Sequence, residues 1–330
     1  MSTATQVPET WELTGDDARR TLQQIGFREL VTDSWQRLRF ADGFSHARSL
    51  AYAIALVLVQ AIISVVGFAS AFGTGGARGV LIRSLKAAVP GPAGQMLTDA
   101  VLQAQRAGAA HQYLGLAFGL VGSLVTGATL MGQVERALNR IYGVEEDRPT
   151  LEKYRRALGL ALTAGALAAS ASVLLVFGNR VGQSVGNEVL ASVWDFGRWP
   201  LALVLMASAI ALLFRWAPRR HQPGWSWLAF GASVSVVLWA AATLALGGFF
   251  GASNSFGRTY GPLAGIVALL LWSLLSSIAL LYGAAIAAQL ESVRAGEPEP
   301  QDEHKVEHSE PELEPVAVGH SQSHFRNWRA

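Results

Sequence analysis

One stretch of this sequence, from Gly261 to Gln289, contains no charged residue. It is longer than the about 20 apolar residues with which an α-helix crosses the hydrocarbon core of a bilayer. Leucine and alanine dominate it, and Pro262 stands at its start, where a helix does not need the missing N–H group. A helix that is apolar on every side has no face to turn to water. The stretch therefore predicts a membrane-spanning helix over 262–289.

Charge-free windows also precede this stretch, and each is long enough to hold one span. Only 15% of all residues are charged, whereas soluble domains carry about 25%. The predicted fold class is all-α: a polytopic membrane helix bundle with six transmembrane helices and additional amphipathic helices at the interface. The predicted spans cover residues 49–72, 113–131, 157–178, 200–216, 226–250 and 262–289.

The segments outside the predicted transmembrane domain, 49–291, differ from it in composition. Residues 1–15 are polar, and we expect them to be disordered. Residues 16–48 predict a cytoplasmic amphipathic helix, which lies either on the anionic membrane surface or against the end of the bundle. Residues 292–330 are rich in glutamate and proline and cannot bury enough apolar surface to order themselves, so we expect a disordered acidic tail.

The first outer loop carries two apolar stripes at helical spacing. These predict short amphipathic helices that either lie at the outer interface or dip between the spans. The stripes consist of Val80, Leu81, Leu85 and Val89, and of Met96, Leu97, Val101 and Leu102.

The basic residues near the span ends predict the orientation. Most of them fall in the segments that share a side with the N-terminus, and cytoplasmic loops are the basic ones. Both termini are therefore expected in the cytoplasm. The exception is the first outer loop, which contains Arg78, Arg83, Lys86 and Arg106.

Three stretches in this order resemble the YihY/BrkB family of bacterial inner-membrane proteins. One is GQVERALNRIYGVEEDRPTLEKYRRAL, from Gly132 to Leu158. The others are Arg215–Pro218 at the end of the fourth span, and YGPLAG from Tyr260 with the long last span that follows it. The resemblance covers roughly residues 20–294 and excludes the acidic tail.

This resemblance implies a multi-pass protein of the bacterial plasma (inner) membrane. Members of the family have been linked to serum resistance and to the export of envelope lipid or lipopolysaccharide. Some members were labelled ribonuclease BN, a label generally regarded as mistaken.

The sequence offers no residues for hydrolytic chemistry. Metal-assisted cleavage of a phosphodiester needs carboxylates or histidines that converge on metal ions. Glu145, Glu146 and Asp147 are adjacent and cannot all point at one ion, and the chain contains no cysteine. We therefore expect no enzyme activity, no catalytic residue, no cofactor and no metal site.

Two groups of residues are candidates for function or for close packing. The cytoplasmic loop after the second span could hold a phosphate or an anionic lipid headgroup, although its basic residues also satisfy the ordinary charge bias of inner loops. This candidate loop comprises Asn139, Arg140, Tyr142, Arg148 and Pro149. Tyr260, Gly261 and Pro262 predict a hinge into the last span, and Gly283 predicts close approach of a neighbouring helix.

Three functions are compatible with these features. The first is a transporter or flippase-like protein for an envelope lipid or another amphipathic compound. The second is a non-transporting membrane scaffold that recruits partners through its termini, and a remote third is a membrane-bound ribonuclease. Membrane lipids are the expected partners. A homo-oligomer and a protein partner for the acidic tail stay open, and no nucleic-acid partner is expected.

Overall fold

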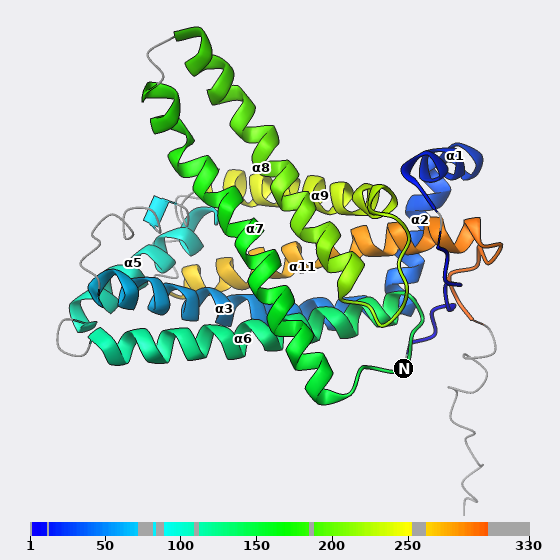
Figure 1. The fold of residues 1–330 in the computed structure, drawn as a ribbon, viewed down its shortest axis with the longest axis horizontal. Coiled ribbons are helices and arrows are strands. Elements are labelled where there is room, and N and C mark those ends of the chain that lie inside the picture. The colour runs from blue at the N-terminus through cyan, green and yellow to red at the C-terminus, as the bar shows by residue number, and fades with distance from the viewer. Residues whose placement is uncertain are drawn as a thin grey trace, which may run out of the picture.

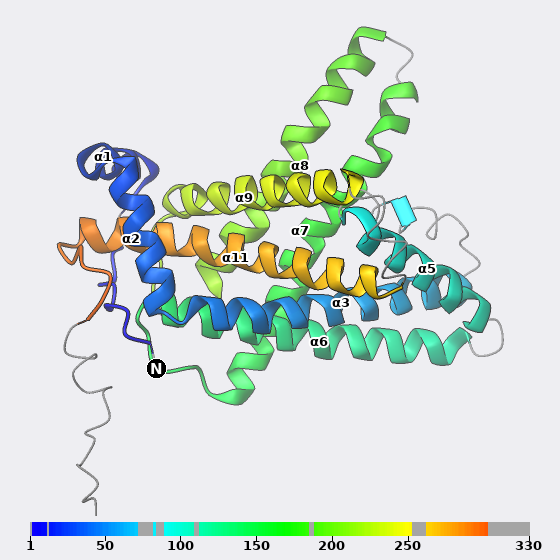
Figure 2. The same ribbon diagram turned by 180° about the vertical axis from the view of Figure 1, so that it is seen from behind.

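The computed structural model describes residues 2–11, 13–71, 82–83, 89–108, 112–184, 188–252 and 262–302. Its ordered elements are helices, as the sequence predicted, apart from an isolated β-bridge between Ala4 and Gln301. Four long helices lie side by side along the molecule (Figures 1 and 2). They are α3 (Gly43–Ala71), α6 (Gln112–Ile141), α9 (Trp225–Ala252) and α11 (Pro262–Arg294). Helix α3 packs against α6 and α11, and α11 packs against α9.

A helical hairpin crosses this layer obliquely. It consists of α7 (Thr150–Ser184) and α8 (Glu188–Trp216), which pack along each other. Helix α7 also contacts α6, and α8 contacts α9, while the tip of the hairpin projects away from the four long helices (Figures 1 and 2).

Each predicted span coincides with one of these helices, the first as far as Ala71, but the number of spans is not settled. Among the described residues, five helices are long and apolar enough to cross a membrane: α3, α7, α8, α9 and α11. Helix α6, which contains the predicted span 113–131, is not counted among them, because several side chains in its first half lie outside the part of the chain that the structure describes. Six spans therefore remains a prediction.

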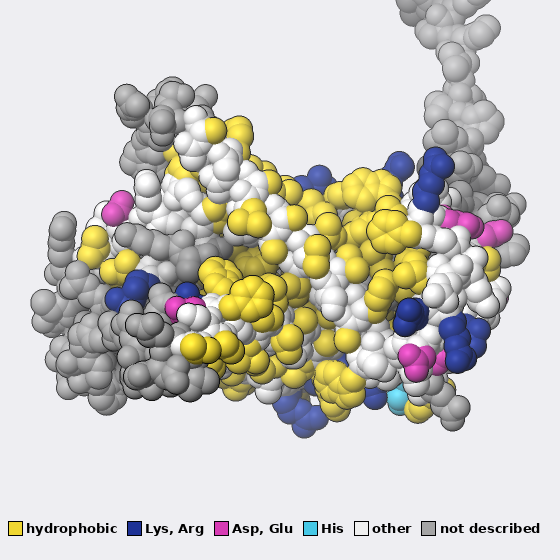
Figure 3. Space-filling model, turned by 90° about the horizontal axis from the view of Figure 1, so that it is seen from above, with side chains coloured by type: hydrophobic (Ala, Val, Ile, Leu, Met, Phe, Trp, Pro, Cys, Tyr) yellow, Lys and Arg dark blue, Asp and Glu magenta, His cyan; other side chains and the backbone are white. Residues whose placement is uncertain are grey.

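Apolar side chains cover the middle of one face, and charged side chains gather towards the end of the molecule with α1 and α2 (Figure 3).

The N-terminal third differs from the expected order. The helix expected over 16–48 is divided into α1 (Gly15–Ile25), α2 (Phe27–Phe40) and the start of α3. Gly26 and Asp42 separate these helices, because both adopt positive φ, +88° and 54°. Helix α2 packs against α11, which places it on the bundle.

The expected N-terminal disorder over 1–15 is not what the structure contains. Residues 2–11, called the N-terminal strap below, run extended across the end of the bundle. Ala4 and Val7 are 0% and 2% exposed. The amide of Thr3 donates to Phe40 O at 2.9 Å, and that of Val7 donates to Tyr142 O at 3.1 Å. Two buried apolar side chains and these backbone hydrogen bonds order the strap, although it has no helical or strand periodicity.

The beginning of the predicted acidic tail is ordered as well. Helix α11 continues to Arg294, and the amide of Asp302 donates to Thr3 O at 2.9 Å. Pro300 O accepts a hydrogen bond from the amide of Thr5 at 3.1 Å. Residues 295–302 thus hold the outer side of the strap, and the rest of the tail lies outside the described residues.

At the opposite end, helix α5 (Gly91–Gly108) contains the second amphipathic stripe of the outer loop. Leu97 and Val101 are 0% exposed, and α5 packs against α11, α3 and α9. This helix is therefore packed on the bundle. Val89 of the first stripe is 2% exposed, and Val80, Leu81 and Leu85 lie outside the described residues.

Candidate functional site

The loop between α6 and α7 folds back on itself around Asp147. The carboxylate accepts hydrogen bonds from Asn139 Nδ2 at 3.1 Å, Lys153 Nζ at 3.1 Å and Arg136 Nε at 3.2 Å. Burial acts to raise the pKa of Asp147, but the hydrogen bonds from Asn139 and Lys153 outweigh it and lower this pKa below its ordinary value. Asp147 therefore remains ionised and serves as the centre of the loop.

Asn139 also connects this loop to the α8–α9 loop. Its side chain is fully buried, and its Oδ1 accepts a hydrogen bond from the amide of Arg219 at 2.8 Å. Arg140 turns to its own loop, where its Nη1 donates to Val144 O at 3.2 Å and Glu145 O at 2.7 Å. Gly143 follows the end of α6 with φ +71°, the left-handed conformation that glycine commonly adopts after a helix end.

Arg148 is bound by protein groups on several sides. Its Nη1 lies 3.2 Å from Glu135 Oε1, and the two side chains are 7% and 2% exposed. The same nitrogen donates to Ala217 O at 2.7 Å, and Nη2 donates to Pro218 O at 2.6 Å. This guanidinium is engaged in joining α6 to the end of α8, so the geometry favours a structural role for Arg148 over headgroup binding. Pro149, next to it, is exposed just before α7 begins.

Replacing Arg148 with alanine is therefore expected to lower the stability of the folded protein. If Arg148 only held a headgroup, as the sequence allows, the substitution would weaken headgroup binding and leave the yield unchanged. In the structure, the substitution leaves the Glu135 carboxylate buried without a cation, which typically costs about 3–5 kcal/mol. Thermal unfolding in detergent would measure the loss. An unchanged midpoint would contradict the structural role, and Arg148→Lys, which keeps the charge, should lose less.

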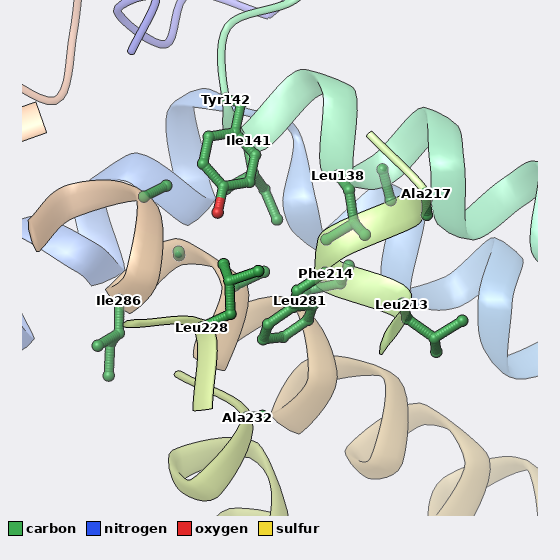
Figure 4. Packing of buried hydrophobic residues seen from close by; sticks show 14 of the residues in the cluster. Leu138, Ile141, Tyr142, Leu213, Phe214, Ala217, Leu228, Ala232, Leu281 and Ile286 are labelled. Carbon is green, nitrogen blue, oxygen red and sulfur yellow. The ribbon is translucent and has the colours of Figure 1, made fainter. Parts of the chain in front are cut away.

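Tyr142 belongs to a second and deeper cluster. Leu138, Ile141 and Tyr142 at the end of α6 face Phe214 and Leu281 in the hydrophobic core (Figure 4). The ring of Tyr142 lies 4.6 Å from the Arg220 guanidinium carbon, an arrangement typical of a cation–π contact. Burial raises the pKa of the Tyr142 hydroxyl, so the side chain stays neutral and able to donate a hydrogen bond.

Arg220 forms the central ion pair of this deeper cluster. Its Nη2 lies 2.7 Å from Glu291 Oε1, and the two side chains are 2% and 0% exposed. Thr10 of the strap donates its hydroxyl to the same carboxylate oxygen at 2.6 Å, and Pro8 O accepts from Arg220 Nη2 at 3.0 Å. The pair thus ties the α8–α9 loop and the end of α11 to the strap.

Arg37 is the second buried arginine. It is 0% exposed, and it donates to Gln289 Oε1 at 2.7 Å, Ser292 Oγ at 2.9 Å and Thr5 O at 3.0 Å. Burial lowers the pKa of Arg37 to about 10, which leaves it charged at neutral pH. Its acceptors are neutral oxygens, so its charge has no directly bonded carboxylate.

The deeper cluster was not predicted from the sequence. Arg37, Arg220 and Glu291 had been assigned to the ordinary charges at helix ends, because their partners lie far away in the chain. Of the predicted hinge, Tyr260 and Gly261 lie outside the described residues, and Pro262 is the first residue of α11. Gly283 lies where α11 crosses α9: a Cβ built there would be 1.9 Å from Ser235 Oγ and 2.5 Å from Gly231 O.

The family described as virulence factor BrkB matches residues 34–308, which include both clusters. The chain belongs to the BrkB family. With the long apolar helices, this membership makes it an integral, multi-pass protein of a bacterial membrane. No solved structure matches the chain.

Curated relatives carry names of two kinds. A UPF0761 membrane protein of Stenotrophomonas maltophilia is 26% identical over 294 residues, which cover 87% of this chain and 66% of the relative. Another, from Chromobacterium violaceum, is 32% identical over 63% of this chain and 48% of the relative. A protein of Bacillus subtilis named as ribonuclease-like, YfkH, is 27% identical over 53% of this chain and 65% of its own length. The matches thus span less than two thirds of each of these relatives.

Among the described residues, no group of three or more acidic or histidine side chains could hold a metal ion. The positions that the structure brings together at this end are arginines, the buried carboxylates of Glu135 and Glu291, amides and a neutral tyrosine. Such groups bind and hold anionic or polar partners.

Proposed function

We propose that this membrane protein moves an amphipathic lipid of the bacterial envelope between the two leaflets. The observation that supports this proposal is the α7–α8 hairpin. Only 17% of the apolar span of α7 and 22% of that of α8 is buried, against 44% for α11. The hairpin diverges from the long helices towards its tip (Figures 1 and 2), and its exposed apolar faces are where we expect the lipid to be bound.

The helix interior also favours a lipid over a proton-coupled solute. The polar groups described within the spans are mainly hydroxyls, and Ser170, Ser208 and Ser233 each donate to the carbonyl four residues back. The hydroxyls of Ser64 on α3 and Ser123 on α6 lie 2.6 Å apart across the two helices. Placing an ionisable group inside a membrane costs free energy, so such groups are typical of transporters that relay protons or couple to ions, and hydroxyls are not.

Lipid that co-purifies with the protein tests this proposal. Native mass spectrometry should detect one class of envelope lipid in excess of its share in the membrane. Truncation after residue 302 should retain this lipid, because the ordered part of the tail stays in place. If no lipid class is enriched, and removal of the tail instead removes a protein partner, the protein is a scaffold.

We also propose that both termini lie in the cytoplasm, because most basic residues near the span ends share a side with the N-terminus. Since the chain contains no cysteine, single cysteines report accessibility without background. Glu145→Cys should be shielded from an impermeant thiol reagent in intact cells, and Asn254→Cys should react. The reverse labelling pattern would overturn the orientation.

A further inference from the structure

The cluster beneath the strap holds more positive than negative charge. Arg37 is 0% exposed and the side chain of Arg220 is 2% exposed, and Glu291 is the one carboxylate that bonds to them among the described residues. Burying an unneutralised charge is expensive, so such an excess requires a reason. The balance of the three groups is about one positive charge, which a singly charged anion would neutralise.

Several donors and acceptors in the same cluster lack hydrogen-bond partners. They are Arg220 Nε, the Tyr142 hydroxyl and both polar side-chain atoms of Gln222, which lies close to that hydroxyl but outside hydrogen-bond geometry. Gln222 is 6% exposed and Tyr142 is fully buried. Unpaired buried polar atoms are rare in native structures, and several of them together indicate a bound group or water.

The strap covers this cluster with neutral atoms. Thr5 O and Pro8 O accept from the two arginines, and Thr10 donates to Glu291. The hydroxyl of Thr5 is itself buried without a partner. Backbone carbonyls carry only partial negative charge. The strap therefore accepts hydrogen bonds from the guanidinium groups but does not neutralise their net positive charge.

We propose that Arg37, Arg220 and Tyr142 form a binding site for a singly charged phosphate group, and that the N-terminal strap occupies this site when the ligand is absent. Withdrawal of the strap frees the donor that Arg37 Nη1 gives to Thr5 O and the donor that Arg220 Nη2 gives to Pro8 O, while Arg37 Nη1 keeps its hydrogen bond to Ile141 O. These join the unpaired Nε of Arg220 and the hydroxyl of Tyr142. Guanidinium donors match phosphate oxygens in geometry and charge. This site is separate from the proposed lipid path and stands whether or not the protein transports lipid.

Cysteine labelling of the strap tests the proposal. Val7 is 2% exposed, and Val7→Cys creates the single thiol of the chain. In nanodiscs of phosphatidylcholine, inorganic phosphate at constant ionic strength should speed labelling of this thiol by about tenfold, as expected when a ligand shifts the strap from bound to released. In a second arm, phosphatidylglycerol replaces part of the phosphatidylcholine. Acceleration by inorganic phosphate identifies a free anion as the ligand, and acceleration by phosphatidylglycerol alone identifies a lipid headgroup.

Matched variants separate a binding site from general loosening. Arg37→Gln retains an amide for Gln289 and Ser292 but removes the charge, so the acceleration should disappear. Tyr142→Phe removes only an unpartnered hydroxyl, should fold normally, and should weaken the response. Ala93→Cys, at a fully buried position in α5 at the other end, should label equally with and without ligand. The proposal is overturned if neither arm changes the labelling of the strap, if both variants respond like the parent, or if Ala93→Cys accelerates equally.

Discussion

Gly283→Leu is expected to prevent correct packing of α9 on α11 and to remove most of the folded yield. A Cβ at Gly283 would be 1.9 Å from Ser235 Oγ and 2.5 Å from the backbone oxygen of Gly231. Gly231 makes the reciprocal contact, because a Cβ there would be 2.5 Å from Gly283 O. Overpacking costs about 1–3 kcal/mol or more, and here the obstacle includes backbone that cannot move aside. Fluorescence-detected size exclusion and thermal unfolding in detergent would measure the loss.

Gly248→Leu is the matched control for this prediction. Gly248 lies on α9, and a Cβ at this position meets no atom within 4 Å. The substitution should leave yield and stability close to those of the parent, since leucine also favours helix more than glycine. If Gly283→Leu is as heat-stable as Gly248→Leu, the close approach of α9 and α11 is wrong.

Arg220→Ala is expected to cause the second large loss. It leaves the Glu291 carboxylate, which is 0% exposed, without its cation, at a typical cost of about 3–5 kcal/mol. The double variant Arg220→Met with Glu291→Leu removes both charges and should recover much of the stability. A double-mutant cycle by thermal or denaturant unfolding would measure the coupling between the two residues.

The neighbouring arginine supplies the control. Arg219 pairs with Glu146, whose side chain is 84% exposed, and such surface pairs contribute about 0–1 kcal/mol. Arg219→Ala should therefore have a small effect. Equal losses in Arg219→Ala and Arg220→Ala would show that the buried pair does not stabilise this end of the bundle.

Local patterns predicted the helices well. A charge-free window is a property of consecutive residues, so the long helices could be located from the sequence, and Gly283 was recognisable as a packing position. Helix α6 shows the limit of this reasoning. Gly119 approaches the backbone of Ser64 so closely that a Cβ would be 2.7 Å from its nitrogen, and a charge-free window does not identify α3 as the helix that makes this contact.

The strap and the buried cluster could not be predicted because they depend on contacts between distant segments. Arg37 bonds to Gln289, 252 positions away in the chain, and Thr10 bonds to Glu291, 281 positions away. In the sequence, Arg37 and Arg148 are indistinguishable from the arginines that set membrane topology. Their burial results from the folding of the strap and the loops over the helix ends.

The most direct test of lipid movement uses an engineered disulfide that fixes α7 of the hairpin to α6. Gly127 of α6 faces Ala161 of α7, and a Cβ at Gly127 would lie 3.6 Å from that of Ala161, within the range for a disulfide. Gly127→Cys with Ala161→Cys would be reconstituted into liposomes of bacterial lipids that contain labelled phosphatidylethanolamine or phosphatidylglycerol. Dithionite quenching from outside measures exchange between the leaflets. The reduced protein should exchange lipid faster than empty liposomes, and oxidation should slow this exchange reversibly. Exchange no faster than in empty liposomes for both lipids, or equal exchange in the oxidised and reduced states, would contradict lipid movement at the hairpin.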